Sequence, residues 1–87
     1  MKYQILYTTS ALKELSRLPE PDFKKIKIAV ESLSKNPFPP GSLKLEGTKE
    51  KLYRIRKGNY RVIYTVQNHL ITITILKIAH RKDVYRF

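Results

Sequence analysis

This sequence contains no cysteine, has only seven acidic residues and has no long hydrophobic run. Without cysteine the chain has no disulfide, no thiolate nucleophile and no cysteine-based zinc site. The longest apolar-rich stretch, residues 70–79, contains two threonines and a lysine and has about half the length that a membrane span requires. No apolar signal peptide follows Met1, so a cytoplasmic protein that makes no membrane contact is expected.

The length and composition favour one small folded unit. A chain of 87 residues suffices for one small domain and not for two, so a single domain over residues 1–87 is expected. Hydrophobic residues make up 41% and aromatic residues 10%, which is the ordinary range for globular proteins and excludes a disordered or fibrous chain.

The positive charge is large and unevenly distributed. The 18 lysines and arginines give a net charge of +11. Residues 51–87 hold nine of these cations and a single acid, Asp83, and therefore carry a net charge of +8. Such a balance suits a polyanion: nucleic acid, a ribosome, an acidic protein or an anionic surface. A charge that served solubility alone would be more evenly spread and mixed in sign, so the second part of the chain is expected to carry a polyanion-binding surface.

The residue patterns predict an α+β domain with the order β-α-α-β-β-β. Residues 3–8 alternate as a strand, and Thr9 or Ser10 can cap a first helix whose apolar face comprises Ala11, Leu12, Leu15 and Leu18. A second helix starts near Pro21 and has an apolar stripe of Phe23, Ile26, Ala29, Val30 and Leu33. Residues 36–41 form a proline-rich connector, and residues 52–57, 60–66 and 70–78 read as a meander of strands. The result is a mainly antiparallel sheet with a helical hairpin on one face.

Gly58-Asn59 is a good two-residue hairpin loop and fixes the register of the strands around it. Lys57 then faces Tyr60, and Arg56 faces Arg61 across the strands. Alternation assigns one set to the helix-covered core: Tyr53, Ile55, Tyr60, Val62 and Tyr64. The opposite, open face receives Arg54, Arg56 and Arg61. A tight turn at Gln67-Asn68 would add Ile71, Ile73 and Ile75 to the core, and Thr72 and Thr74 to the open face.

Two arginines opposed across strands repel each other, so propensity alone would not select the pair Arg56 and Arg61. An anion between them reverses the sign of the interaction, because guanidinium groups bind phosphate with two parallel hydrogen bonds. Together with Arg54 they form a plausible phosphate clamp. The alternative is that these arginines are simply solvated.

The last residues, from Ala79 to Phe87, place a histidine, a tyrosine and several cations close together. Strand alternation alone sends Arg81 toward the core, so the tail is expected to bend. Taken singly, His80 and Tyr85 have ordinary structural explanations, in surface hydrogen bonding and in packing.

The sequence resembles the RelE/ParE toxin superfamily of toxin–antitoxin systems, and within it the RelE branch of ribosome-dependent mRNA endonucleases. The resemblance covers nearly the whole chain and rests on four segments in order: residues 11–15 (ALKEL), 43–47 (LKLEG), 53–64 (YRIRKGNYRVIY) and 80–85 (HRKDVY). It implies that Arg61, Arg81 and Tyr85 are catalytic. The RNA-binding residues expected beside them are Arg54, Arg56, Lys57, His80 and Lys82.

One departure from the family matters chemically. Some active members have lysine at the positions of Arg54 and Arg56, and lysine can exchange a proton whereas arginine essentially cannot. Proton transfer would therefore fall to Tyr85, to His80, or to the RNA and the ribosome. The seven acidic residues show no metal-site spacing, so we expect no metal and no cofactor, and cleavage through the 2′-hydroxyl of the RNA itself.

The resemblance also implies partners: a cognate acidic antitoxin in a hetero-oligomer, the ribosome and mRNA. Two other functions stay open. A ParE-like poison of DNA gyrase shares the fold but is not expected to need the full arginine and tyrosine set. A non-catalytic RNA-binding module, or a decayed toxin, would keep the basic face and lose nothing when Tyr85 is removed.

Overall fold

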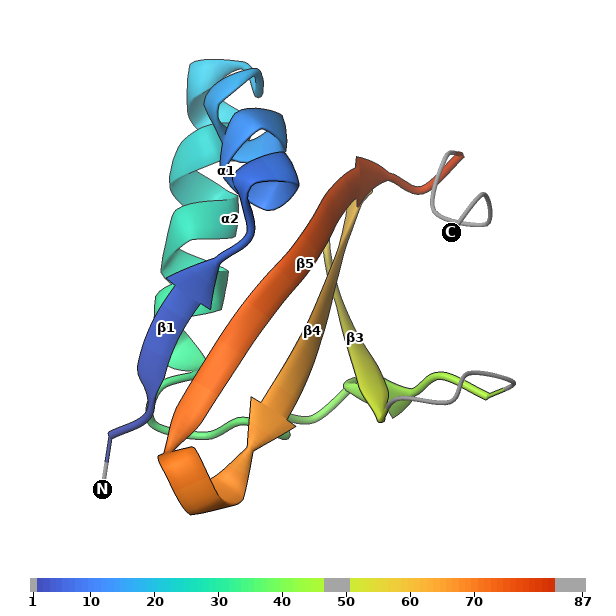
Figure 1. Cartoon of the computed structure of the whole chain (residues 1–87). Helices are drawn as coiled ribbons and strands as arrows, with labels where there is room; N and C mark the ends of the chain where they lie inside the picture. Colours follow the sequence, from blue (N-terminus) through green and yellow to red (C-terminus); the bar gives the residue numbers. More distant parts are fainter. Residues whose placement is uncertain (1, 47–50, 83–87) are drawn as a thin grey trace.

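The computed structural model describes residues 2–46 and 51–82 (Figure 1). Its elements are β1 (Gln4–Tyr7), α1 (Thr9–Ser16), α2 (Glu20–Ser32), β2 (Leu43–Lys44), β3 (Leu52–Lys57), β4 (Tyr60–Gln67), the 3-10 helix η1 (Asn68–Leu70) and β5 (Thr72–His80). The five strands form one sheet in the order β1-β5-β4-β3-β2. The predicted α+β architecture with a mainly antiparallel sheet is confirmed.

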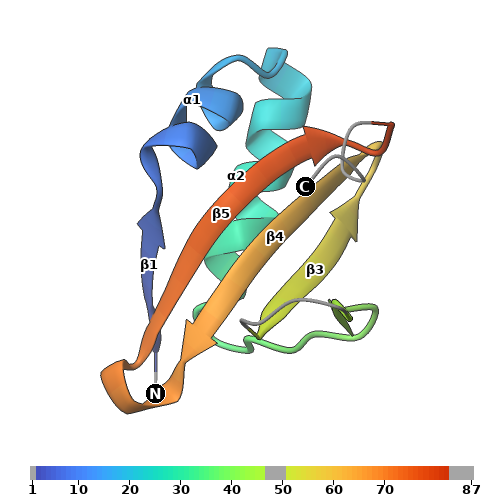
Figure 2. The ribbon, with the colours of Figure 1, turned by 45° about the vertical axis from the view of Figure 1, so that its right-hand side comes forward.

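The strand pairing combines one parallel and three antiparallel contacts. Strand β1 joins β5 in parallel, whereas β5, β4, β3 and β2 pair antiparallel in turn. Both helices lie on one side of the sheet, and in Figure 2 α2 passes behind β5 and β4. The short edge strand β2 was not expected from the sequence, because its two exposed residues leave no alternating pattern to detect.

Helix α1 begins after Thr8, whose hydroxyl accepts a hydrogen bond from the Ala11 amide at 3.1 Å. The sequence places this cap one or two residues later, because Thr9 and Ser10 are also good capping types. Ala11 and Leu15 are buried as expected, but Leu12 is 55% exposed. The expectation for Leu12 is therefore wrong, since a helix turns by about 100° per residue and this short helix presents only a narrow stripe to the sheet.

Helix α2 starts at Glu20, one residue before the predicted start, with Pro21 in its first turn. Its buried residues, Ile26 and Val30, follow the predicted stripe, and Leu33 is buried at its end. The connector that follows is held against the sheet. The Tyr64 hydroxyl donates a hydrogen bond to the Pro37 carbonyl at 2.6 Å.

The hairpin between β3 and β4 has the register that the Gly58-Asn59 loop predicts. The observed partners are Lys57 with Tyr60, Arg56 with Arg61, Ile55 with Val62, Arg54 with Ile63, and Tyr53 with Tyr64. Gly58 has a φ of 59°, a conformation that glycine adopts without the Cβ strain of other residues. The turn chemistry therefore fixed every pair in this hairpin.

The turn between β4 and β5 is longer than the predicted two residues. It contains the 3-10 helix η1, and it closes at Ile71, which has a left-handed φ of 49°. Ile71 is only half-buried and does not belong to the core cluster, so its predicted place beside Ile73 and Ile75 is wrong. Ile71 ends the turn in this left-handed conformation, and β5 begins at the next residue, Thr72.

Strand β5 contains a register shift that changes which of its residues face the core. Tyr64 pairs with Ile75, but the preceding Ile63 pairs with Lys77, so Leu76 is an extra residue opposite the Ile63/Tyr64 step. Such a bulge offsets side-chain alternation by one residue. The apolar core on the helix side accordingly takes Ile73 and Ile75 before the bulge and Ile78 after it.

Candidate nucleic-acid interface

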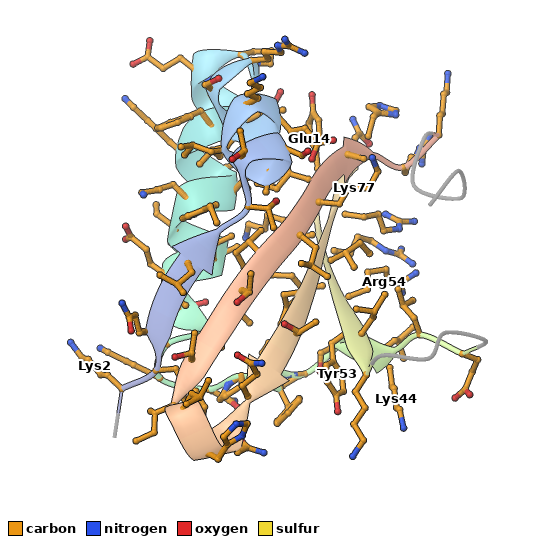
Figure 3. All side chains as sticks on the ribbon, viewed as in Figure 1. Lys2, Glu14, Lys44, Tyr53, Arg54 and Lys77 are labelled. Atoms are coloured by element: carbon orange, nitrogen blue, oxygen red, sulfur yellow. The ribbon has the colours of Figure 1, made fainter. Side chains whose placement is uncertain are left out.

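The open face of the sheet, opposite the helices, carries the predicted arginine cluster in two neighbouring rows. One row runs Arg56–Arg61–Ala79 across β3, β4 and β5, and the next runs Arg54–Ile63–Lys77. In Figure 3, Arg54 points away from the helices. We name Arg54, Arg56 and Arg61 the arginine face. Local register alone brings its three guanidinium groups to one side of one hairpin.

Arg61 differs from the other arginines because it is almost fully buried, with 7% of its surface exposed. Its neighbours across the strands are Arg56, which is exposed, and the small residue Ala79. Burying a charge is costly unless other groups compensate it. A guanidinium held in the sheet surface is nevertheless pre-positioned, so it loses little conformational freedom when it meets an anion.

Arg81 is brought to the same end of the sheet by the backbone. Its amide donates a 2.7 Å hydrogen bond to the Asn59 carbonyl in the β3–β4 turn, which extends the β4–β5 ladder by one step. Because Ala79 lies beside Arg61 on the open face, alternation assigns Arg81 to that face as well. The chain turns at Arg81 and Lys82 directly after β5, as the predicted bend requires, and the bulge at Leu76 has by then already changed the alternation of β5.

The arginine face does not include three further candidate residues, Lys57, His80 and Lys82. Lys57 and His80 pair with Tyr60 from opposite sides, which puts them on the helix side of the sheet and away from the arginine face. The rings of Tyr60 and His80 meet edge to face with centroids 5.6 Å apart, and His80 Nδ1 accepts the Lys82 amide at 3.3 Å. Lys82 itself is exposed just beyond β5. Tyr85 lies outside the described residues.

A second, smaller apolar cluster lies on the open face below the arginines. Leu52 and Ile63 are buried there, with Leu45 and Leu76 packed against them. A hollow of about 400 Å³ adjoins this cluster at the end of the sheet far from the β3–β4 turn, lined by Lys51, Thr65, Val66, Gln67, Thr74 and Leu76. The open face therefore changes along the strands from cationic to mixed apolar and polar.

Sequence reasoning did not single out the contact between Glu14 on α1 and Lys77 on β5, which holds β5 at this site. The Glu14 carboxylate on α1 accepts the Ile78 amide at 2.9 Å and the Lys77 ammonium group at 3.3 Å. Figure 3 shows Glu14 and Lys77 together at the upper part of β5. A signal for the bulge was present, because apolar residues occupy positions 73, 75, 76 and 78 and the period of two fails between 75 and 78. No comparable signal marked Glu14.

Within residues 2–46 and 51–82, no three His, Cys, Asp or Glu side chains gather in a group that could hold a metal ion. In the same ranges, no helix has the length and apolar character needed to traverse a bilayer.

Comparison with known proteins defines the family. The sequence model described as ParE toxin of type II toxin–antitoxin system, parDE, matches residues 5–85. The chain is 32% identical over 90 residues to Toxin RelG of Mycobacterium tuberculosis, with 99% of each chain covered. It is 34% identical over 88 residues to Putative toxin RelE1 of Methanocaldococcus jannaschii, covering 99% of this chain and 98% of the relative. The chain therefore belongs to the RelE/ParE superfamily of toxins from type II toxin–antitoxin systems.

Solved structures agree with this assignment. The archaeal RelE–RelB complex from Pyrococcus horikoshii contains a chain with a TM-score of 0.81 and 35% identity, covering 93% of this chain and 97% of that one. The M. tuberculosis toxin–antitoxin complex RelBE2 contains a chain with a TM-score of 0.83 and 26% identity, covering 93% of this chain and all of that one. The resemblance to the RelE/ParE toxin superfamily that was inferred from the four sequence segments is thus confirmed.

Proposed function

We propose that this toxin is an endoribonuclease that cuts messenger RNA on the ribosome and thereby inhibits translation. The observation that carries the proposal is the arginine face, where the nearly buried Arg61 lies beside Arg56 and in the row next to Arg54. Opposed cations on one sheet surface favour a substrate with closely spaced negative charges. A phosphodiester backbone has that property.

The proposed reaction uses the RNA's own 2′-hydroxyl as nucleophile. A base removes the hydroxyl proton, the oxygen attacks the adjacent phosphorus in line, and the bond to the 5′-oxygen breaks as that oxygen takes up a proton. The products are a 2′,3′-cyclic phosphate and a 5′-hydroxyl. The phosphorane gains negative charge before it breaks down, and Arg61 and Arg81 are assigned to stabilise it. Arg54 and Arg56 hold the distorted backbone.

Tyr85 is assigned the proton transfer, since the arginines essentially cannot release a proton. His80 is the second candidate, but its ring packs edge to face on Tyr60 on the helix side of the sheet, away from Arg61. Lys57, His80 and Lys82 then contribute mainly long-range attraction for RNA. No metal or cofactor is assigned to the reaction.

The partners follow from the same charge. A net charge of +11 on a small toxin favours capture by an acidic antitoxin, in a hetero-oligomer that covers part of the surface near Arg61 and Arg81. The related chains with solved structures come from complexes named RelE–RelB and RelBE2, which supports such a partner. The ribosome is proposed as the second anionic partner, and the cytoplasm as the site of action.

Poisoning of DNA gyrase remains the competing function, because the matching family description names ParE. The two are separated by an in vitro translation reaction in which mRNA 3′ ends are mapped, run beside a gyrase supercoiling assay. The proposal predicts new 3′ ends only when ribosomes are present, together with normal supercoiling. Rapid cutting of naked RNA at low salt, or loss of supercoiling, would contradict it.

The catalytic assignment is tested by Tyr85→Phe, which removes one oxygen and keeps the ring and the net charge. Single-turnover cleavage on ribosomes should fall by a factor of about 10² to 10⁴, the range for one general acid–base group, while ribosome affinity changes little. His80→Gln is the matched comparison and should stay within a few-fold of wild type. Cleavage by Tyr85→Phe at the wild-type rate would make the tyrosine structural and leave His80 as the next candidate.

A further inference from the structure

The edge of the sheet next to β1 is completed by a helix rather than by a strand. Strand β1 pairs with β5 from Gln4–Thr72 to Tyr7–Ile75 and then ends. Strand β5 continues for five more residues, to His80, and none of the described residues forms a strand beside that stretch on this edge. Backbone groups on an uncovered edge need other partners.

Helix α1 and its N-cap supply these partners. The Thr8 amide donates to the Ile75 carbonyl at 3.0 Å, and the Thr8 hydroxyl donates to the Leu76 carbonyl at 3.3 Å. One helical turn and a half further on, Glu14 accepts the Ile78 amide at 2.9 Å. These contacts bracket the bulge at Leu76 on both sides.

The bulge determines which face the end of β5 presents. Before it, Ile73 and Ile75 face the helices; after it, Ile78 does, so Ala79 lies on the open face beside Arg61. If the extra residue were accommodated beyond Arg81 instead, alternation would turn Ala79 and Arg81 toward the helix side. The position of the bulge therefore selects the side on which Arg81 lies.

Glu14 is distinct from the other acids with ion pairs among the described residues. Glu20 and Glu31 pair with lysines four residues away on α2, and their side chains are 78% and 62% exposed. Glu14 is 28% exposed and joins α1 to a lysine 63 positions later in the chain. Its carboxylate binds one backbone amide and one ammonium group, both immediately after the bulge.

We infer that Glu14 is a positioning residue, which fixes the bulge of β5 at Leu76 through the Ile78 amide and Lys77 and so holds Arg81 on the arginine face. The inference rests on the proposed cleavage function for its kinetic test, because it assigns Arg81 a part in that reaction. Its structural test is independent of cleavage. Glu14 itself is not assigned any contact with RNA.

The structural test is hydrogen exchange of single amides in the full chain. Glu14→Ala should speed exchange of the Ile78 and Arg81 amides by at least tenfold, while the Ile55 amide in β3 stays within a factor of about two. Glu14→Gln keeps an oxygen that can accept from Ile78 and should lie between. Glu31→Ala is the matched control, since it removes an ion pair of the same kind on α2. Unchanged exchange at Arg81 in Glu14→Ala would overturn the inference.

The kinetic test is a double-mutant cycle with Arg81 in single-turnover cleavage on ribosomes. Glu14→Ala should slow the wild-type toxin by about 10- to 100-fold, as expected when a catalytic group is misplaced by about 1 Å. In an Arg81→Lys background the same change should cost less than threefold, because Glu14 acts through residue 81. Equal losses in both backgrounds would show a general structural role and overturn the inference.

The outcomes also separate this inference from the proposed function. If the wild-type toxin does not cut mRNA on ribosomes, the proposed function fails, and the hydrogen-exchange result still decides whether Glu14 holds β5. If the wild type cuts and Glu14→Ala cuts equally fast, the inference fails and the proposed function stands. Should Glu14→Ala not fold, Glu14→Gln carries the same two measurements with a smaller expected effect.

Discussion

The two faces of this sheet use the same strands for different purposes. On the helix side, Val62, Tyr64, Ile73 and Ile75 are completely buried and form one continuous core with α1 and α2. On the open side, the alternate residues of the same strands form the arginine face and a small cluster around Leu52 and Ile63. One hairpin register therefore produces both surfaces, so a shift of this register by one residue would exchange them.

The faces also differ in what an individual side chain contributes. Apolar side chains on the helix side stabilise the fold through burial, at about 25 cal/mol for each Å² of apolar surface removed from water. The opposed arginines destabilise the fold instead, since like charges across strands repel each other. We therefore expect substitutions on the helix side to change the free energy of unfolding, and substitutions on the arginine face to change cleavage and binding.

The largest expected effect is on the helix side. Ile73→Ala removes a completely buried side chain from the middle of β5, so the free energy of unfolding should fall by about 2–5 kcal/mol in urea denaturation. Its neighbour Thr74 lies on the open face, and Thr74→Ala should cost less than about 1 kcal/mol. Equal losses of unfolding free energy for the two variants would mean that the two faces contribute equally to the stability of the fold.

On the arginine face, Arg61→Ala should mainly slow the reaction. The transition state should lose about 2–4 kcal/mol of stabilisation, or roughly 30- to 1000-fold in single-turnover cleavage on ribosomes. Arg17→Ala, at the end of α1, removes the same charge from the helix side and serves as the control. Cleavage by Arg61→Ala within threefold of wild type would exclude Arg61 from the catalytic set.

A smaller effect is expected from Arg56→Gln, which removes the exposed member of the opposed pair. If Arg56 contacts one phosphate, the slope of log affinity for single-stranded RNA against log salt should decrease by about 0.7. Lys24→Ala is the control, because Lys24 lies on α2 and pairs with Glu20 at 3.4 Å. An unchanged slope for Arg56→Gln would remove this residue from the RNA-binding set.

The smallest expected effect is the pH dependence of stability that Tyr64 causes on the helix side of the sheet. Burial raises the pKa of Tyr64 to about 12, and its hydroxyl donates to the Pro37 carbonyl. The neutral phenol is therefore favoured in the folded state, and this stabilisation is lost as the pH rises from the ordinary pKa of 10.0 toward 12. Tyr64→Phe should be less stable than wild type by about 1 kcal/mol below pH 9, and the gap should narrow above pH 10. A constant gap up to pH 11.5 in urea denaturation would contradict this assignment.

The sequence predicted the features that depend on local chemistry. A two-residue loop at Gly58-Asn59 specifies strand pairing over six residue pairs, and the arginine face follows from that register alone. The helix stripes around Leu15 and Ile26 were also readable from their spacing. In each case the determining residues lie within a few positions of one another.

The features that were missed depend on contacts between distant segments. The bulge at Leu76 is stabilised from α1, more than 60 residues earlier in the chain, and only a broken alternation hinted at it. Because the bulge sets the side of Arg81, the sequence alone could not assemble the complete candidate site. The helix-side positions of Lys57 and His80 follow from the registers of β3 and β5 with Tyr60.

The parallel contact between β1 and β5 also has a consequence for how the protein forms. It joins segments 68 residues apart, so it is among the last contacts that a growing chain can make. Long-range pairing of this kind closes slowly, because the loop must lose its entropy before the contact is formed. The local β3–β4 hairpin, which carries the arginine face, is therefore expected to form before β1 and β5 close the sheet.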